Sequence, residues 1–421
     1  MAPPKLPSLR SIETRDRLVG HLNHLTPAQT IALDGFKTKL AADGFYTPAT
    51  ETEEASSDEP TLLRFLRARK FDVAGAYEQF TSSEKWRREA HVAETYDDHP
   101  VPEFKETEKV YPQWTGRRDK AGLPVYVFKI NGLTKDAINK YNAQPERLDV
   151  RMIALYEHMV QFVLPFCSSV PHSHQEVPIS ATTTIVDISD VSLSRFWALR
   201  SHMQRASNLA NQNYAETLGT IYIVGAPGFF SVVWGWIGKW FDPGTVEKIF
   251  ILKHDEVLST LTRFIEPENI PKQFGGELPW AYGDINGPSL DEAEKETLGL
   301  DECPRGSIRW VRGEVVIKGT GRTPEELAKC TPKKKAVVEE KAVPVVAPVA
   351  VVTPVAEKTV EQAVAEVEAG KALAPSISDD ATIAVPADGE GAGDHDIWTT
   401  AKDNVAAPVK DLAATLEGTT L

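Results

Sequence analysis

The sequence is poor in cysteine. Its 421 residues include only Cys167, Cys303 and Cys330, which are odd in number and show no metal-ligand spacing. Disulfide scaffolds and zinc sites both need closely spaced sets of cysteines. The sequence therefore argues against a disulfide framework, and we expect three buried thiols in a reducing compartment.

Long apolar runs are missing as well. Residues 1–7 contain no apolar core of signal-peptide length, and no later run approaches the ~20 apolar residues that span a bilayer. We therefore expect a cytoplasmic chain that contacts membranes only peripherally.

Basic residues are outnumbered in this chain. It has 46 lysines and arginines against 60 aspartates and glutamates, which gives a formal net charge of −14 at pH 7. General nucleic-acid binding requires a basic surface that neutralises phosphates. The charge balance therefore predicts no nucleic-acid partner, while it still allows local basic clusters.

The patterns of common catalytic and metal sites are absent too. Asp187 and Asp190 follow a predicted strand, but no nucleophile elbow, phosphate-binding glycine loop or metal-ligand helix accompanies them. His172 and His174 lie in a loop without a third metal ligand nearby. We therefore predict a protein that is not an enzyme and needs no metal or cofactor.

One stretch of the sequence is rich in tryptophan and phenylalanine. Read as a helix over 229–241, it turns apolar side chains to almost every side and stops at Asp242-Pro243, too early to span a bilayer. Such a helix is either an ordinary core helix or a lid over an apolar cavity that dips into a membrane surface. Composition leaves both interpretations open. The residues concerned are Phe229, Phe230, Val233, Trp234, Trp236, Ile237, Trp240 and Phe241.

The remaining pattern indicates a helical part followed by an α/β part. Helices are predicted at 27–43, 61–71 and 73–89, with Asp72 as an N-cap. Runs rich in β-branched and aromatic residues then alternate with helical segments, which predicts a mostly parallel sheet. The predicted strands are 125–130, 182–188, 219–224 and 248–252, and the predicted helices are 149–164, 193–214, 229–241 and 254–265.

Composition also suggests where the parts begin and end. We expect a flexible N-terminus over 1–26, a helical subdomain over 27–95, an α/β domain over 101–283, an extension over 284–330 and a tail over 331–421. The extension contains two short strands, 307–311 and 314–318, that can pair as a hairpin. The tail is rich in Ala, Val, Pro and Glu, and we expect it to be disordered.

Several segments, taken together, resemble the CRAL-TRIO lipid-binding family, and specifically its phosphatidylinositol transfer proteins of the secretory pathway. The ordered set, from about residue 27 to 283, is more specific than any one segment. In chain order the segments are 62–72, 84–87, 111–113, 119–126, 184–187, 225–227, 242–252, 268–271 and 274–276. The resemblance implies a sheet that floors an apolar pocket, with helix 229–241 as its gate. It also implies a protein that transfers a phospholipid between membranes without covalent chemistry.

The resemblance further implies residues for the lipid headgroup. In the family, basic residues of the helical subdomain and a Thr and a Lys after the gate hold a phosphate, which suits the need of a phosphodiester for charge-assisted donors. A family carboxylate that contacts inositol hydroxyls falls on Glu216, while Thr217 stands where relatives carry Arg. The alternative for the basic run from Arg64 to Lys70 is a solvated helix face. The phosphate residues fall on Arg69, Lys70, Thr245 and Lys248.

For phosphatidylcholine, the family uses a deeper site of hydroxyls and aromatic rings, which suits a quaternary ammonium. One tyrosine of that site falls on Thr115, so the aromatic cage is incomplete. The other residues fall on Tyr126, Tyr156, Thr182 and Thr184.

The expected partners are a phospholipid, a transiently contacted membrane surface, and a lipid kinase or tail-binding protein. We expect a monomer that acts at Golgi, endosomal or other internal membranes. Two alternatives stay open: a non-exchanging lipid sensor that presents its ligand to a partner, and a haem-binding, hydrophobe-binding or lipid-hydrolysing protein.

Overall fold

The structure is a computed structural model that describes residues 7, 16–133, 139, 143–238, 243–283 and 287–330. Residues 1–338 form one compact unit, and all that follows concerns the described residues within it. The predicted disordered tail, 331–421, lies outside the described residues, as do Trp240 and Phe241 of the predicted gate.

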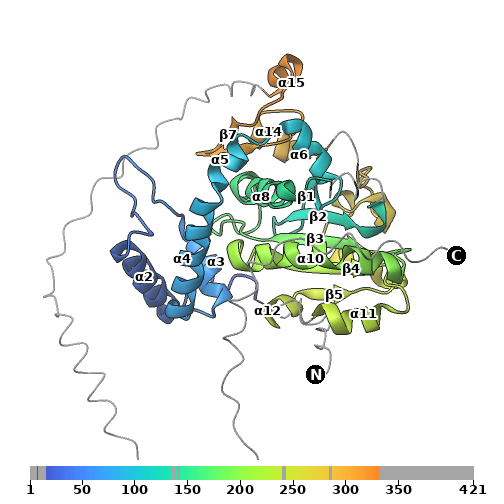
Figure 1. The fold of residues 1–421 in the computed structure, drawn as a ribbon, viewed down its shortest axis with the longest axis horizontal. Helices are drawn as coiled ribbons and strands as arrows, with labels where there is room; N and C mark the ends of the chain where they lie inside the picture. The colour runs from blue at the N-terminus through green and yellow to red at the C-terminus, as the bar shows by residue number, and fades with distance from the viewer. Residues whose placement is uncertain are drawn as a thin grey trace, which may run out of the picture. The chain divides into compact units, whose positions relative to one another are not determined.

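A five-stranded sheet in the order β1-β2-β3-β4-β5 forms the centre of this unit (Figure 1). β2 to β5 are parallel to one another, and β1 pairs with β2 in the antiparallel sense. The predicted mostly parallel sheet is therefore confirmed. β1 was not predicted, because its sequence Gln-Trp-Thr-Gly-Arg-Arg is largely polar, as an edge strand can be. The strands are β1 Gln113–Arg118, β2 Pro124–Lys129, β3 Thr182–Asp187, β4 Leu218–Val224 and β5 Ile249–Ile251.

Helices cover both faces of the sheet because alternate strand residues point to opposite sides. On one face, Ile221, Ile223 and Ile249 pack with residues of α8, α10 and α11. On the other face, Val125 and Val127 pack with α13. These helices are α8 Leu148–His158, α10 Leu193–Asn213, α11 Phe230–Ile237 and α13 Val257–Phe264.

The single helix predicted over 149–164 is longer and less regular than expected. α8 continues through a π-helical turn, Met159–Val163, into α9, Leu164–Ser169. Pro165 in the first turn of α9 has no N–H to donate to the preceding turn, which accounts for the change of helix type there.

The predicted N-terminal helices are present. Asp72 caps α4 as expected, since its carboxylate accepts hydrogen bonds from the backbone amides of Ala74 and Gly75. The helix predicted to run through Phe71 instead ends at Ala68, because Lys70 and Phe71 adopt left-handed φ angles of 52° and 63°. The helices are α2 Pro27–Ala42, α3 Glu59–Ala68, α4 Val73–Glu89, α5 Val92–Asp97 and α6 Val101–Glu108.

The C-terminal extension packs on the α/β part. The ring of Trp310 lies 5.2 Å from that of Phe166, and the Tyr96 hydroxyl donates a 2.6 Å hydrogen bond to the carbonyl of Ile308. The predicted hairpin is confirmed as β6 and β7. The elements are α14 Glu292–Leu298, β6 Ile308–Val311, β7 Glu314–Ile317 and α15 Pro324–Lys329.

Short helical turns make the remaining connections: η1 Ile130–Gly132, η2 Pro145–Arg147, α12 Pro243–Val246, η5 His254–Glu256, η6 Pro267–Asn269 and η7 Lys272–Phe274. All three cysteines are buried and unpaired, which confirms that prediction. Within the described part of the chain, every helix is too short or too polar to cross a bilayer.

Candidate functional site

A cavity of about 790 Å³ lies at the amino-terminal edge of the parallel sheet. The amino ends of β2 to β5 meet there because these strands run in the same direction. Residues just before or at the start of each strand therefore share its lining, as Leu123, Ala181, Leu218 and Lys248 do. This edge is opposite to that of Asp187, which ends β3.

Two of the predicted headgroup residues meet in this cavity. The Lys248 ammonium donates a 2.7 Å hydrogen bond to the Glu216 carboxylate, and the side chains are only 7% and 23% exposed. Glu216 has a left-handed φ of 56°, an unfavourable conformation for a non-glycine residue. The turn between α10 and β4 thus holds this carboxylate toward Lys248, and strained residues of this kind are common at binding sites.

Helix α3 contributes a further charged residue, Arg67, to the lining of the cavity. Arg67 donates hydrogen bonds to the backbone carbonyl of Gly20 at 3.4 Å and to the Ser180 hydroxyl at 3.2 Å. Burial lowers the pKa of Arg67 to about 10, although the negative charge of Glu216 opposes this shift. The solvated-face interpretation is wrong for the neighbouring Arg64, which is buried.

Arg67 was not among the predicted site residues, although the sequence does carry a signal for it. Its position four residues after the fully buried Leu63 puts it on the inner side of α3. The predicted Arg69 and Lys70 follow the end of α3 and are exposed, and neither lines the cavity. Thr245 is buried in α12 and is also outside the lining. Their roles at a headgroup stay predictions.

The outer wall is a segment that we call the N-terminal strap, residues 16–24. It lines the cavity with residues that include Arg17 and His21. Asn23 donates a 2.7 Å hydrogen bond to the backbone carbonyl of Glu176, and His24 contacts the Glu176 carboxylate at 3.2 Å. The strap therefore connects α3 to the loop that precedes β3.

The turn between β1 and β2 is fixed by hydrogen bonds behind the cavity. The buried Asp119 carboxylate accepts bonds from the Thr183 hydroxyl at 2.7 Å and from the backbone amide of Leu123 at 2.9 Å. Burial raises the pKa of Asp119. Arg17 of the strap approaches the same carboxylate at 3.8 Å, so the strap is also attracted to this turn.

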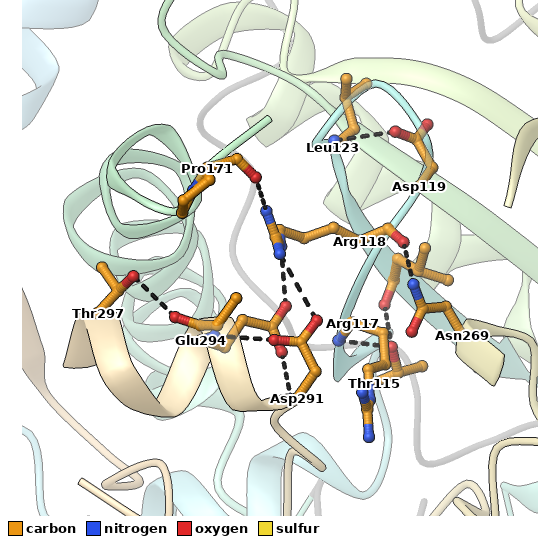
Figure 2. Close-up of polar contacts among 12 residues, drawn as sticks. Thr115, Arg117, Arg118, Asp119, Leu123, Pro171, Asn269, Asp291, Glu294 and Thr297 are labelled. Atoms are coloured by element: carbon orange, nitrogen blue, oxygen red, sulfur yellow. Dashed lines mark hydrogen bonds and ion pairs between the residues drawn. The ribbon is translucent and has the colours of Figure 1, made fainter. Parts of the chain in front are cut away.

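Figure 2 shows how Arg118, next to this turn, ties the extension to the cavity wall. Its guanidinium donates 3.0 Å hydrogen bonds to the Glu294 carboxylate and to the carbonyl of Pro171, the residue before the lining residue His172. Asp291 lies 3.5 Å from the same guanidinium. Burial and the nearby Asp291 charge raise the pKa of Glu294 to about 7.

The predicted choline residues lie together on the α8 side of the sheet, away from this cavity. Tyr126 and Thr184 are register partners in β2 and β3, and the Thr182 and Thr184 hydroxyls are 3.4 Å apart. Tyr156 packs in the same apolar cluster as Tyr126. Thr115, which replaces a family tyrosine, is buried and donates a 3.0 Å hydrogen bond to the carbonyl of Val125.

A buried polar network that the sequence did not reveal supports Tyr156. The ring of Tyr156 stacks on Tyr214 with 4.7 Å between centroids, and the Tyr214 hydroxyl donates a 2.7 Å hydrogen bond to Glu157. Arg87 of α4 binds both oxygens of Glu157, at 2.8 and 3.0 Å. The helical subdomain therefore holds this part of α8 through a bidentate ion pair.

The described part of the predicted gate helix contains α11, Phe230–Ile237, while residues 239–241 lie outside the described residues. Phe230, Val233, Trp234 and Ile237 are buried in the apolar cluster on the sheet, whereas Trp236 is 41% exposed. None of the described α11 residues lines the 790 Å³ cavity. The function of α11 as a gate stays a prediction.

Comparison with known proteins finds two matching domain profiles and several relatives. The CRAL/TRIO domain profile matches residues 108–276, and the CRAL/TRIO N-terminal domain profile matches residues 32–82. A SEC14 cytosolic factor of Candida glabrata is 34% identical over 260 residues, which are 62% of this chain and 82% of that protein. The phosphatidylinositol/phosphatidylcholine transfer protein SFH7 of Arabidopsis thaliana is 30% identical over 58% of this chain and 43% of that protein. The solved structure of Sfh5 aligns with a TM-score of 0.46 at 16% identity, over 64% of this chain and 96% of that chain.

Both parts of the family pattern occur in this chain in the expected order, and a relative at 34% identity is matched over most of its length. The chain belongs to the CRAL/TRIO domain family.

Proposed function

We propose that this protein binds one phospholipid, phosphatidylinositol in the first place, and transfers it between membranes without making or breaking a covalent bond. The observation that carries the proposal is the ion pair between the buried Lys248 and the partly buried Glu216 in a cavity of about 790 Å³. It occurs in a chain whose relatives include a phosphatidylinositol/phosphatidylcholine transfer protein.

The chemistry of this pair suits an inositol phospholipid. A phosphodiester withdrawn from water needs charge-assisted donors, and the Lys248 ammonium has two N–H groups beyond the one that binds Glu216. The Glu216 carboxylate can accept hydrogen bonds from ring hydroxyls. Thr245, Arg69 and Lys70 are proposed as further headgroup contacts, on the resemblance alone.

The acyl chains need an apolar space. Each buried CH₂ group contributes about 0.8 kcal/mol, so one chain of ordinary length represents roughly 12 kcal/mol of transfer free energy. We propose that they lie over the sheet face that carries Ile221, Ile223 and Ile249, and that α11 moves to admit them. The exposed Trp236 would then enter the membrane interface, where tryptophan is favoured.

Phosphatidylcholine is proposed as a second ligand. Tyr126, Tyr156, Thr182 and Thr184 would surround its choline group, with Tyr214 stacked behind Tyr156. We further propose a monomer that acts peripherally on the cytoplasmic side of Golgi or endosomal membranes, with a lipid kinase or tail-binding protein as partner.

A transfer assay tests this function. Purified protein is mixed with donor vesicles that contain labelled phosphatidylinositol and with unlabelled acceptor vesicles. We expect protein-dependent transfer that Lys248→Ala lowers at least tenfold, whereas Lys253→Ala, at a 78% exposed side chain outside the cavity, leaves it unchanged. No transfer by the wild-type protein would contradict the proposed function, and full transfer by Lys248→Ala would contradict the assigned headgroup site.

A further inference from the structure

We propose that Arg67 and His21 bind the phosphate group of the ligand in this cavity, together with Lys248. The N-terminal strap would then be part of the binding site itself. The identification of this phosphate as a lipid headgroup rests on the proposed function, whereas the assignment of the two residues rests on the charges and hydrogen bonds of the cavity.

Negative charge is in short supply around Arg67 and Lys248. Arg67 and Lys248 both line the cavity, and the Glu216 carboxylate interacts with both of them. Two cations therefore share this carboxylate. The lining as a whole also holds more basic than acidic residues: Arg17, Arg67, Lys120, Lys248 and Arg263 against Asp16, Glu216 and Glu247. A phosphodiester carries one negative charge, which would balance the excess positive charge of Arg67, Lys248 and Glu216. This excess positive charge needs a counter-charge because charges interact more strongly away from water.

Arg67 and His21 also have hydrogen-bonding capacity available for a ligand. A guanidinium has five N–H groups, and the hydrogen bonds from Arg67 to Gly20 and Ser180 use only two of them. The Nδ1 atom of His21 is buried and has no hydrogen-bond partner among the described residues. Burial, reinforced by the positive charges of Arg67 and Lys248, lowers the pKa of His21 to about 4. An anion beside these groups would reverse the effect of the charges and favour a protonated, donating imidazole.

The path of the strap places His21 next to Arg67. The strap passes close to α3 at Gly20, where an added Cβ would lie 3.1 Å from the ring of Phe71 and 3.4 Å from the Arg67 side chain. Gly20 also has a φ of 77°, which favours glycine. The close passage places the neighbouring His21 beside Arg67 in the lining. A phosphate bound there would be covered by the strap, so exchange of the ligand would require the strap to move.

Arg69 provides a matched comparison for Arg67. Both residues belong to the same basic run, but Arg69 is exposed and donates a 3.3 Å hydrogen bond to the carbonyl of its neighbour Ala68. The resemblance to the family assigns the phosphate to Arg69 and Lys70. We add to these residues the arginine two positions earlier, which lines the cavity.

The test measures binding to the full chain by titration calorimetry with two probes, glycerophosphoinositol and inorganic phosphate. The variants are Arg67→Gln, His21→Gln and Arg69→Gln, with Ser180→Ala as a control that removes one hydrogen bond of Arg67 but not its charge. We expect Arg67→Gln and His21→Gln each to weaken binding of glycerophosphoinositol about tenfold or more. Arg69→Gln should weaken binding less than Arg67→Gln because Arg69 is exposed, and Ser180→Ala should stay within about twofold of the wild type.

A second measurement separates ligand contact from a structural effect. NMR titration of the His21 imidazole should show its pKa rising by at least one unit when glycerophosphoinositol is bound, and Arg67→Lys should restore most of the affinity lost in Arg67→Gln. An unchanged His21 pKa, or equal losses in Arg67→Gln and Arg69→Gln, would overturn the proposal.

The two probes also separate the sources of the phosphate. Preference for glycerophosphoinositol over inorganic phosphate supports a lipid headgroup. If inorganic phosphate binds as well and the wild type transfers no lipid, the proposed function fails while the assignment of Arg67 and His21 stands. If neither probe binds, the assignment itself is overturned, whatever the outcome of the transfer assay.

Discussion

Replacing Arg87 by methionine should destabilise the protein by about 3 kcal/mol. Arg87 makes a bidentate ion pair with Glu157, whose side chain is only 1% exposed. Removing one partner of a buried pair leaves the other charge buried and uncompensated, which costs about 3–5 kcal/mol. We expect a loss at the lower end of this energy range because the Arg87 side chain is 24% exposed and water reaches part of the ion pair.

A second substitution should recover part of this loss. In the double variant Arg87→Met/Glu157→Gln the buried charge is gone, yet the amide oxygen of glutamine can still accept the hydrogen bond that Tyr214 now donates to Glu157. We expect the double variant to be at least about 1 kcal/mol more stable than Arg87→Met alone. Arg88→Met, at the exposed neighbouring position, should change stability by less than about 1 kcal/mol.

Urea unfolding followed by circular dichroism measures these differences at pH 7. The reasoning would be refuted if Arg87→Met lost less than about 1 kcal/mol, or if adding Glu157→Gln made that variant less stable still.

Three further predictions concern other parts of the molecule. The pKa of Glu294 is raised from 4.5 to about 7, so the folded state keeps a proton that the unfolded state releases, and stability falls as the pH rises between these values. Glu294→Gln should remove this pH-dependent contribution when unfolding free energies are compared from pH 4.5 to 8. Parallel curves of unfolding free energy against pH for the two proteins would contradict this prediction. Trp236→Ala should weaken vesicle binding in co-sedimentation with little loss of stability, because Trp236 is 41% exposed. Trp234→Ala, at a 5% exposed position, should lower the free energy of unfolding in urea by about 3–5 kcal/mol. Equal effects of the two substitutions on stability would refute this difference between the two tryptophans. Thr184→Val removes a hydroxyl of the proposed choline site and should lower phosphatidylcholine transfer several-fold while phosphatidylinositol transfer stays within about twofold; an equal loss of both activities would remove Thr184 from that site.

Features with a local cause could be predicted from the sequence. The parallel strands β2 to β5 follow from runs of β-branched and aromatic residues, and the start of α4 follows from Asp72, whose carboxylate caps the helix. The hairpin β6–β7 was likewise indicated by a turn around Gly313 between two short strands. In each case residues close in the chain determine the structure.

Features with long-range causes could not be predicted. The strap is held by Asn23 and the carbonyl of Glu176, 153 residues apart, and nothing in the composition of residues 16–24 indicates that contact. The Arg87–Glu157 pair joins residues 70 positions apart. The choice between Arg67 and Arg69 depended on where α3 ends, and helix ends are poorly determined by periodicity.

The central claim is that this chain takes up one phospholipid molecule at a time. Native mass spectrometry of the full chain, purified from cells without added detergent, tests it most directly. The account predicts a species that exceeds the chain mass by one phospholipid, which dissociates on activation and is identified as phosphatidylinositol or phosphatidylcholine. A spectrum that contains only the bare chain, also after incubation with phosphatidylinositol vesicles, would contradict it.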